Sequence, residues 1–265
     1  MESGSIFAGT AQYYAQYRPR YPEELFSLLR DTFGLNARSR VLDLGCGPGP
    51  LSLRLAPQVE RVIAIDPNRE MLAEGKRLAG AQNVDNIDWL TGESGQLSAF
   101  SDRIGDLDLT VMGRSFHWMD REQTLRDLYC MTKPGGGVAV IDDSGPAGGK
   151  PAPWRELTWE VIREWLGEER RAGVNRVYSH PKEEHGKILR QSSFRDYESV
   201  QIPVERTSTL DEVIGGLFST SHCAPPVLGD LKDGFEADLR KRLLELDPSG
   251  LYQEKVVVEV KIVRK

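Results

Sequence analysis

The segment Val41-Leu-Asp-Leu-Gly-Cys-Gly-Pro-Gly-Pro50 joins an apolar strand to three alternating glycines, and a helical pattern over Leu51–Ala56 follows it. Glycines at these places let the backbone turn sharply and let a ligand approach without a clash with a Cβ atom. The start of the following helix is expected to supply free N–H donors. A second apolar strand, Arg61–Ile65, ends in Asp66, a carboxylate positioned to accept hydrogen bonds from the hydroxyls of a ribose. The segment therefore predicts a site for a ligand that contains a nucleoside.

The glycine pattern argues against a dinucleotide. A dinucleotide fingerprint requires its third glycine three residues after the second, for close packing of helix and strand around a pyrophosphate, and this chain has Pro50 there. NAD and FAD are therefore disfavoured, and a nicotinamide oxidoreductase is the most distant hypothesis. A nucleoside ligand without a diphosphate remains.

The same segment resembles the first motif of the class I S-adenosylmethionine (SAM)-dependent methyltransferases, in particular a small-molecule, methyltransferase type 11-like group. Asp43, the GxGxG turn and Asp66 stand where that family has them. The resemblance implies SAM as the cofactor and S-adenosyl-L-homocysteine as the product. It also implies a Rossmann-like α/β fold, with a seven-stranded mostly parallel sheet, an antiparallel last strand, helices on both faces and an inserted cap. Strand patterns that alternate with helical patterns in the first half of the chain favour the same parallel sheet.

Two further segments match the family's cofactor contacts. Within Asn86–Ser94, Glu93 corresponds to the acid that accepts a hydrogen bond from the adenine amino group, and Ser94 offers its backbone N–H to the ring. The alternative for Glu93 is a solvated loop carboxylate. Near the N-terminus, Tyr13–Pro22 resembles the entrance motif of this group, in which Arg18 would bind the carboxylate of the cofactor, because a guanidinium binds carboxylates bidentately.

The tyrosines of this entrance motif have two interpretations. Tyr13, Tyr14 or Tyr17 would close over the sulfonium or the substrate, or they pack an arm onto the sheet edge. The residues expected at the cofactor are Tyr14, Arg18, Asp43, Gly45, Cys46, Gly47, Asp66, Pro67, Met71, Glu93, Ser94 and Arg114.

The strand pattern Leu107–Gly113 leads into Arg114-Ser-Phe-His-Trp-Met-Asp120, which resembles the fourth motif of small-molecule methyltransferases of this class. The segment lacks the [DN]-P-P-[YF] sequence of related families that methylate amino groups of adenine or glutamine. In the family's fold, His117 would lie beside the transferable methyl group, as a general base or as a residue that only orients the loop. Arg114 is also a candidate contact for a substrate anion.

His117, His222 and Tyr13 are the candidate catalytic residues. His222 belongs to Phe218–Cys223, a helix-to-loop segment that faces the substrate cleft in related sequences. His180 and His185 stand in a charged stretch and are expected to be solvated at the surface. In-line methyl transfer needs little covalent help, so the protein is expected to supply geometry, exclusion of water and, where the nucleophile must lose a proton, a base.

The second half of the chain changes in pattern. A Gly/Pro-rich connector follows residue 142, and we expect three parts: residues 1–142, a SAM-binding core with an N-terminal lid; residues 143–195, a cap or substrate insertion; and residues 196–265, the C-terminal part of the sheet domain. The tryptophans of the cap helix either pack the cap or stack on substrate. The expected helices are Trp154–Leu166, Leu210–Phe218 and Leu228–Leu246, and the expected strands are Tyr197–Arg206 and an antiparallel Lys255–Val263.

Composition narrows the functions further. The net charge of −6 argues against a nucleic-acid surface, and no stretch approaches a membrane span. Three scattered cysteines, Cys46, Cys130 and Cys223, indicate neither disulfides nor a metal site, so a cytoplasmic enzyme is expected. The leading hypothesis is methylation of O or N of a small molecule, such as a secondary metabolite, by a monomer or homodimer. A non-catalytic SAM-binding regulatory protein and an RNA or protein methyltransferase are the alternatives.

Overall fold

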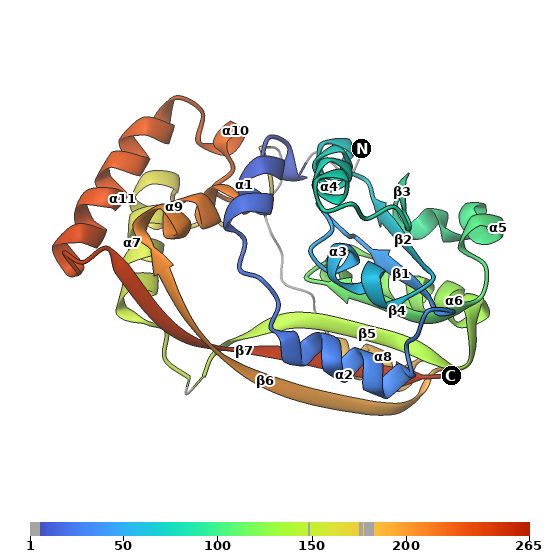
Figure 1. The fold of residues 1–265 in the computed structure, drawn as a ribbon. Coiled ribbons are helices and arrows are strands. Elements are labelled where there is room, and N and C mark those ends of the chain that lie inside the picture. Colours follow the sequence, from blue (N-terminus) through green and yellow to red (C-terminus); the bar gives the residue numbers. More distant parts are fainter. Residues whose placement is uncertain (1–5, 148, 175–176, 178–182) are drawn as a thin grey trace. The chain divides into compact units, whose positions relative to one another are not determined.

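The computed structural model describes residues 6–147, 149–174, 177 and 183–265 (Figure 1). His180 lies outside the described residues. Seven strands form one sheet in the order β3-β2-β1-β4-β5-β7-β6. The strands are β1 Arg40–Leu44, β2 Arg61–Asp66, β3 Ile87–Thr91, β4 Leu107–Gly113, β5 Thr132–Pro146, β6 Arg195–Thr209 and β7 Leu251–Arg264.

The helices follow the predicted alternation with the strands. The α-helices are α1 Ala11–Tyr17, α2 Glu23–Phe33, α3 Ser52–Leu55, α4 Arg69–Ala81, α5 Ser101–Ile104, α6 Arg121–Met131, α7 Pro153–Leu166, α8 His185–Gln191, α9 Leu210–Phe218, α10 Pro225–Leu228 and α11 Lys232–Leu246. Short 3-10 helices are η2 Ala56–Gln58, η3 Ser94–Phe100, η4 Phe116–Trp118 and η5 Gly229–Leu231. Among the described residues, no helix is both long enough and apolar enough to cross a bilayer.

The first five strands are parallel. β1 pairs with β2 on one side and with β4 on the other, β3 extends the sheet beyond β2, and β5 extends it beyond β4. The chain therefore reverses its direction across the sheet between β1 and β4, and in open α/β sheets ligands bind at such a switch point, outside the carboxyl ends of the strands.

β7 completes the sheet in the opposite direction. Gly135 N–H donates to the Lys265 carbonyl at 2.9 Å, and Lys265 N–H donates to the Gly136 carbonyl at 2.8 Å, so the start of β5 meets the end of β7. β7 lies between β5 and β6 in the strand order. The predicted seven-stranded, mostly parallel sheet with an antiparallel last strand is confirmed.

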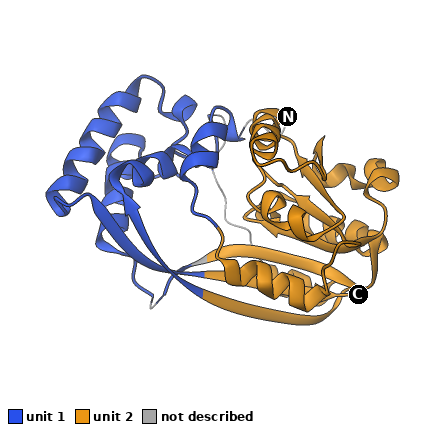
Figure 2. Cartoon of the chain, viewed as in Figure 1, with its two compact units in different colours: residues 1–20, 144–180, 203–257 blue, residues 21–143, 181–202, 258–265 orange. Residues whose placement is uncertain are grey.

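The chain forms two compact units, coloured in Figure 2, and each is described by itself. Unit 2 holds residues 21–143, 181–202 and 258–265. Its core contains strand residues such as Leu42, Ile63 and Met112, which are fully buried, together with apolar residues of α6 and α8. Strands covered on both faces need such continuous apolar runs, which is why these segments could be identified in the sequence.

Unit 1 holds residues 1–20, 144–180 and 203–257. Its core joins apolar side chains of α7, α9 and α11, among them Trp154, Phe218 and Phe235. The predicted division placed these helices in two separate parts, the cap and the C-terminal segment. Their shared hydrophobic core explains why they cluster together instead, since contacts between residues far apart in sequence decide this grouping.

Two details of unit 1 were open or wrong in the sequence prediction. Trp154 Nε1 donates to the Gln253 carbonyl at 3.0 Å and Trp165 Nε1 donates to Asp238 at 2.9 Å, so both rings pack within the unit. The single helix predicted over Leu228–Leu246 is wrong at its start. Gly229 has a φ of +53°, which ends α10, and α11 begins only at Lys232.

A glycine pair in α9 offers a test of the packing in unit 1. A Cβ atom on Gly215 would lie 2.2 Å from the Tyr17 ring, whereas the nearest atom to a Cβ on Gly216 is 3.8 Å away. We expect Gly215→Ala to lower the free energy of unfolding by about 1–3 kcal/mol, because it overpacks the α1–α9 contact. Gly216→Ala is the matched control and should raise it by roughly 0.5–1 kcal/mol through helix propensity. Equal effects in urea unfolding would contradict this packing.

Candidate functional site

The glycine turn between β1 and α3 has the conformation that its sequence requires. Gly45, Gly47 and Gly49 all have positive φ, at +73°, +55° and +82°. The N–H groups of Gly45 and Cys46 donate to the Ile65 carbonyl at 2.8 and 3.1 Å. The turn is therefore bonded to the last residues of β2.

Asp66 closes this arrangement from the end of β2. Its Oδ2 accepts a hydrogen bond from Gly47 N–H at 2.8 Å, and its Oδ1 accepts one from Asn68 N–H at 2.8 Å. The side chain of Asn68 in turn caps α4 by accepting from the N–H groups of Glu70 and Met71. Asp66 is 9% exposed, and burial raises the pKa of its carboxyl above the usual value. The structure thus brings the predicted acid into direct contact with the predicted turn.

The backbone donors of this turn are already used, which corrects the expectation that the start of the next helix supplies free N–H groups. Gly49 N–H donates to the Cys46 carbonyl, and Ser52 N–H, at the start of α3, donates to Asp43. Pro48 and Pro50 have no N–H group. α3 is only four residues long. A diphosphate needs a cradle of free backbone donors, and none of the N–H groups of Gly45, Cys46, Gly47 or Gly49 is available for one.

Asp43 stabilises the turn through hydrogen bonds with Ser52. Its Oδ2 accepts hydrogen bonds from Ser52 N–H at 3.1 Å and from Ser52 Oγ at 2.6 Å, and the residue is 1% exposed. Burial raises the pKa of Asp43 to about 7, although both hydrogen bonds from Ser52 lower it. Burial also raises the pKa of the Cys46 thiol, so this cysteine is not a nucleophile. Asp43 and Cys46 therefore have a structural role in the turn.

Close packing is a second reason, besides the approach of a ligand, why Gly45 and Gly49 must be glycines. A Cβ on Gly45 would lie 2.5 Å from Cβ of Ser115, whose Oγ donates to the Leu44 carbonyl at 2.7 Å. The loop after β4 is therefore held against the loop after β1. A Cβ on Gly49 would lie 2.4 Å from the Trp89 ring, so Trp89, which the sequence analysis did not single out, shapes the turn through packing.

The other residues of unit 2 that were predicted to contact the cofactor differ in their burial. Met71 is buried in the first turn of α4, and Pro67 is half-buried at the end of β2. Glu93 caps η3: its side chain accepts from Gln96 N–H, and its own N–H donates to Gln96 Oε1 at 3.1 Å. Glu93 is exposed and Ser94 is half-buried. Their contacts with adenine stay predictions.

Arg114 occupies a strained position directly after β4. Its φ is +55°, which is uncommon for a residue other than glycine and clusters at functional sites. Its guanidinium pairs with Asp143 at 2.9 Å and lies 4.8 Å from the centre of the Tyr21 ring. Tyr21 belongs to the entrance motif, but the sequence analysis assigned it no role. A Cβ on Gly113 would lie 2.5 Å from its hydroxyl, so Tyr21 reaches the carboxyl end of β4.

His117 lies in η4, directly after that strand, as its motif predicted. It is half-buried, and its ring is 4.8 Å from Trp118 and 6.4 Å from His185, centre to centre. The fourth motif therefore places an imidazole near the carboxyl end of β4. Its role as a base stays a prediction.

His185 corrects a second expectation. It begins α8 and is not a solvated surface residue: its side chain is 15% exposed and lies 5.1 Å from Phe116, centre to centre. Arg121 Nη1 lies 3.1 Å from Nδ1, and since a guanidinium can only donate, Nδ1 accepts. The proton is therefore on Nε2, which is 3.7 Å from Asp142 Oδ2.

The surroundings of His185 keep it neutral. Burial, Arg121 and Lys261 lower the pKa of His185 to about 4, while Glu259 acts in the opposite direction. Burial raises the pKa of Asp142 to about 7, although Lys261 and Arg114 lower it. Sequence reasoning missed this pair because residues 142 and 185 come together only when α8 packs beside β5. The charged residues next to His185 in the sequence indicated an exposed surface and did not predict its burial.

The remaining candidates belong to unit 1. Tyr13 stacks with Tyr17 at 6.3 Å and meets the Phe218 ring edge-on at 5.4 Å. Arg18 lies over the Tyr14 ring at 5.2 Å and Nη1 donates to Ser219 at 3.5 Å. His222 is 5% exposed and stacks on Trp159. Tyr13 therefore packs α1 against α9, whereas His222 packs against α7. The proposed roles of these residues toward cofactor or substrate stay predictions.

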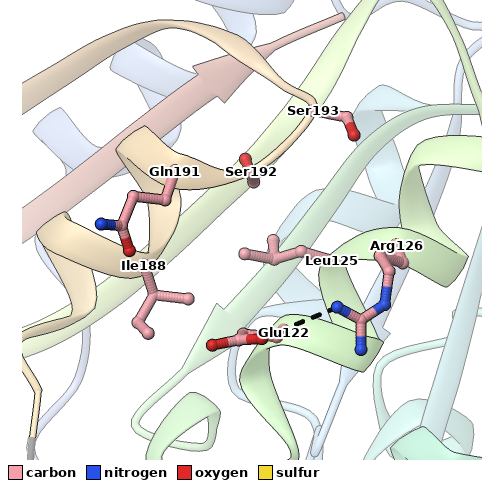
Figure 3. A pocket seen from close by; sticks show the side chains of 7 residues that line it. All are labelled: Glu122, Leu125, Arg126, Ile188, Gln191, Ser192 and Ser193. Atoms are coloured by element: carbon pink, nitrogen blue, oxygen red, sulfur yellow. Dashed lines mark ion pairs between the residues drawn. The ribbon is translucent and has the colours of Figure 1, made fainter.

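A groove of about 320 Å³ between α6 and α8 is not a candidate for this site (Figure 3). Its lining includes Glu122 and Arg126 of α6, which form an ion pair at 3.7 Å, and Ile188 and Gln191 of α8. No residue predicted for the cofactor or for catalysis lines this groove.

The neutral His185 predicts a dependence of stability on pH. The unfolded chain protonates this histidine near pH 6.5, whereas the folded chain does so only near pH 4. The contribution of the neutral His185 to the free energy of unfolding is therefore lost as pH falls from 6.5 to about 4. His185→Gln should remove this loss, which is at most about 1.4 kcal/mol per pH unit.

The measurement is the free energy of unfolding in urea at several pH values, taken as the difference between the variant and the wild type. The difference is needed because the raised pKa of Asp142 changes stability in the opposite direction: the contribution of Asp142 is lost as pH rises from 3.8 toward 7. Parallel stability curves for the two proteins would show that His185 titrates normally.

Comparison with known proteins identifies this architecture. Residues 41–136 match the family model of a methyltransferase domain. A protein of Schizosaccharomyces pombe named as an uncharacterized methyltransferase is 32% identical over 169 residues, which are 62% of this chain and 61% of that protein. The chain thus spans less than two thirds of this relative's length.

Solved structures agree on the fold. A putative type II methyltransferase from Anaeromyxobacter dehalogenans has a TM-score of 0.62 at 22% identity, with 93% of this chain and 97% of that chain covered. Phosphoethanolamine N-methyltransferase 2 of Haemonchus contortus, in complex with SAM, has a TM-score of 0.53 at 16% identity, with 98% and 56% covered. Residues 41–136 are therefore similar to methyltransferase domains, and the solved structures share the fold of the chain.

Proposed function

We propose that this protein transfers a methyl group from SAM to an oxygen or nitrogen atom of a small molecule. The observation that carries the proposal is the hydrogen bond from Gly47 N–H to Asp66, within a turn whose own donors are used internally. Such a turn suits an adenosyl ligand with a cationic tail and does not suit a diphosphate. The similarity of residues 41–136 to methyltransferase domains supports the same cofactor.

The residues at the switch point fit SAM in charge as well as in shape. Asp66 keeps lone pairs on both oxygens after accepting two backbone hydrogen bonds, so it can also accept from ribose hydroxyls. Asp66, which contacts the turn directly, is an acid, and a carboxylate there disfavours a polyanion and favours a cation. Gly45 and Gly47 are both partly exposed, so the backbone of the turn is accessible to a ligand. When bound there, SAM would supply an electrophilic methyl group on a sulfonium.

The residues after β4 would then act on the methyl acceptor. His117 is the candidate that accepts a proton when the nucleophile must lose one. Arg114, held by Asp143 and the Tyr21 ring, is the candidate contact for an anionic group of the cofactor or the substrate. Phe116 is fully buried beside them and excludes water from the back of the loop. Because proximity and exclusion of water carry most of this chemistry, few polar groups are needed.

The net charge of −6 supports a small-molecule acceptor over RNA or DNA, whose phosphates require clustered cations. We retain a cytoplasmic monomer or homodimer without a membrane partner as part of this proposal. The contacts of Tyr14, Arg18, Glu93 and Ser94 with the cofactor, and the catalytic roles of Tyr13 and His222, belong to it as well.

Calorimetric titration with SAM tests the cofactor site. We expect Asp66→Ala to weaken binding about 10- to 100-fold, which corresponds to the loss of hydrogen bonds to a charged acceptor. Asp66→Asn, which keeps one acceptor, should have an intermediate effect. Asp88→Ala is the control, because Asp88 lies on β3 in an ion pair with Arg61 and away from the turn. Unchanged affinity in Asp66→Ala, with a folded protein, would refute the site.

Turnover tests the role of His117. With labelled SAM and an acceptor found in a panel of phenols, amines and carboxylic acids, His117→Ala should lower kcat about 10²- to 10⁴-fold, the contribution of a general base. SAM affinity should change little. Unchanged turnover would assign His117 to loop structure. Binding without transfer to any acceptor would favour the regulatory alternative.

A further inference from the structure

Unit 1 contains a pocket of its own, of about 250 Å³, at the C-terminal end of α7. Trp159, Ile162 and Leu166 of α7 form an apolar wall, and the segment that follows the helix contributes Arg170 and Arg171. His222 completes the lining. All lining residues belong to unit 1, whereas the glycine turn and Asp66 belong to unit 2. The residues that line this pocket are therefore different from those of the glycine turn.

His222 has an unusual environment for a buried imidazole. It is 5% exposed, and neither ring nitrogen has a hydrogen-bond partner among the described residues. Burial, Arg170 and Arg18 lower the pKa of His222 to about 3, so the ring is neutral, with one donor and one acceptor unused. Buried polar groups in native proteins almost always have partners, and an exception calls for an explanation. A ligand in the pocket that His222 lines would provide one.

Trp159 presents an aromatic surface beside this imidazole. It is 39% exposed, although it is a large apolar residue, and its ring is parallel to that of His222 at 5.3 Å, with an angle of 11° between the planes. The guanidinium of Arg170 lies 5.8 Å from the Trp159 ring centre. A flat ring available on a pocket wall suits stacking with another flat ring.

The charges around the pocket indicate one negative charge on the ligand. Arg163, Arg170 and Arg171 stand against Glu168 and Glu169, so the lining has an excess of one positive charge, with His222 neutral. Among the described residues, the side chains of Arg163 and Arg171 form no ion pair. Guanidinium groups bind carboxylates through paired hydrogen bonds. A doubly charged phosphate would exceed the available positive charge.

We propose that this pocket binds a small planar aromatic monocarboxylate, whose ring stacks on Trp159 and whose carboxylate lies among the arginines within reach of His222. The unused N–H of His222 donates to the carboxylate. The apolar side chains of Ile162 and Leu166 cover the ring edge. The proposed function also gives His222 a catalytic role, but binding of this ligand does not require the transfer of a methyl group.

Isothermal titration of the full chain with 2-naphthoate tests the proposal. Two comparators separate its parts: 2-naphthylmethanol, which has the ring without the charge, and cyclohexanecarboxylate, which has the charge without the aromatic ring. We expect each comparator to bind about tenfold more weakly than 2-naphthoate, the loss that corresponds to about one charge-assisted hydrogen bond or one aromatic contact. If 2-naphthoate binds no better than the alcohol, or does not bind, the proposal is overturned.

Variants then assign the binding to this pocket. Trp159→Leu should weaken 2-naphthoate binding about tenfold, while Trp118→Leu, which alters a tryptophan of similar exposure at 36%, should not. His222→Leu should also weaken binding about tenfold, yet keep or raise the melting temperature, because it removes unpaired buried polar atoms. If Trp159→Leu does not fold, Trp159→Phe, which keeps a ring, should retain most of the affinity. Unchanged binding in both Trp159→Leu and His222→Leu would overturn the proposal.

Discussion

The hydrogen bond between Gly47 N–H and Asp66, at 2.8 Å, is the interaction on which the proposed cofactor site depends. It joins the turn after β1 to the end of β2, and the paired contacts of Gly45 and Cys46 with the Ile65 carbonyl reinforce it. Because these bonds occupy the donors of the turn, the site has the acid that an adenosyl group needs and lacks the donors that a diphosphate needs. The proposal that the turn binds SAM and not a dinucleotide rests on this one network.

Two further acids lie near the carboxyl ends of the strands. Asp43 is almost completely buried and takes both of its hydrogen bonds from Ser52, so its function is to fix the start of α3. Asp142, within β5, lies 3.7 Å from Nε2 of the neutral His185 in the same unit. Both carboxyls have a pKa near 7, since burial disfavours their charged forms. Stabilisation of the carboxyl ends of the strands therefore responds to pH in the physiological range.

The hydrophobic core of unit 1 is formed by other residues than that of unit 2. Its core is built from aromatic and apolar side chains of α7, α9 and α11, and Trp154 and Trp165 belong to that packing. Trp159, on the same helix, does not: it remains exposed beside the unpaired imidazole of His222. Helical spacing places Trp154 and Trp165 on the same face of α7 and Trp159 on a different face. Burial and hydrogen bonding agree with this spacing, because the first two pack within the unit and Trp159 lines a pocket.

The resemblance to a known family implied the antiparallel last strand. The sequence predicted the parallel strands, their order of appearance and the meeting of the glycine turn with Asp66 from apolar periodicity and glycine spacing, which are local signals. It could not reveal that the N–H groups of the turn are consumed, that His185 is buried against Asp142, or that Gly229 interrupts the predicted helix. It also could not group α7 with α9 and α11 in one unit. These features depend on contacts between residues far apart in the chain, and burial, pKa and the use of hydrogen-bond donors are set only when those residues come together.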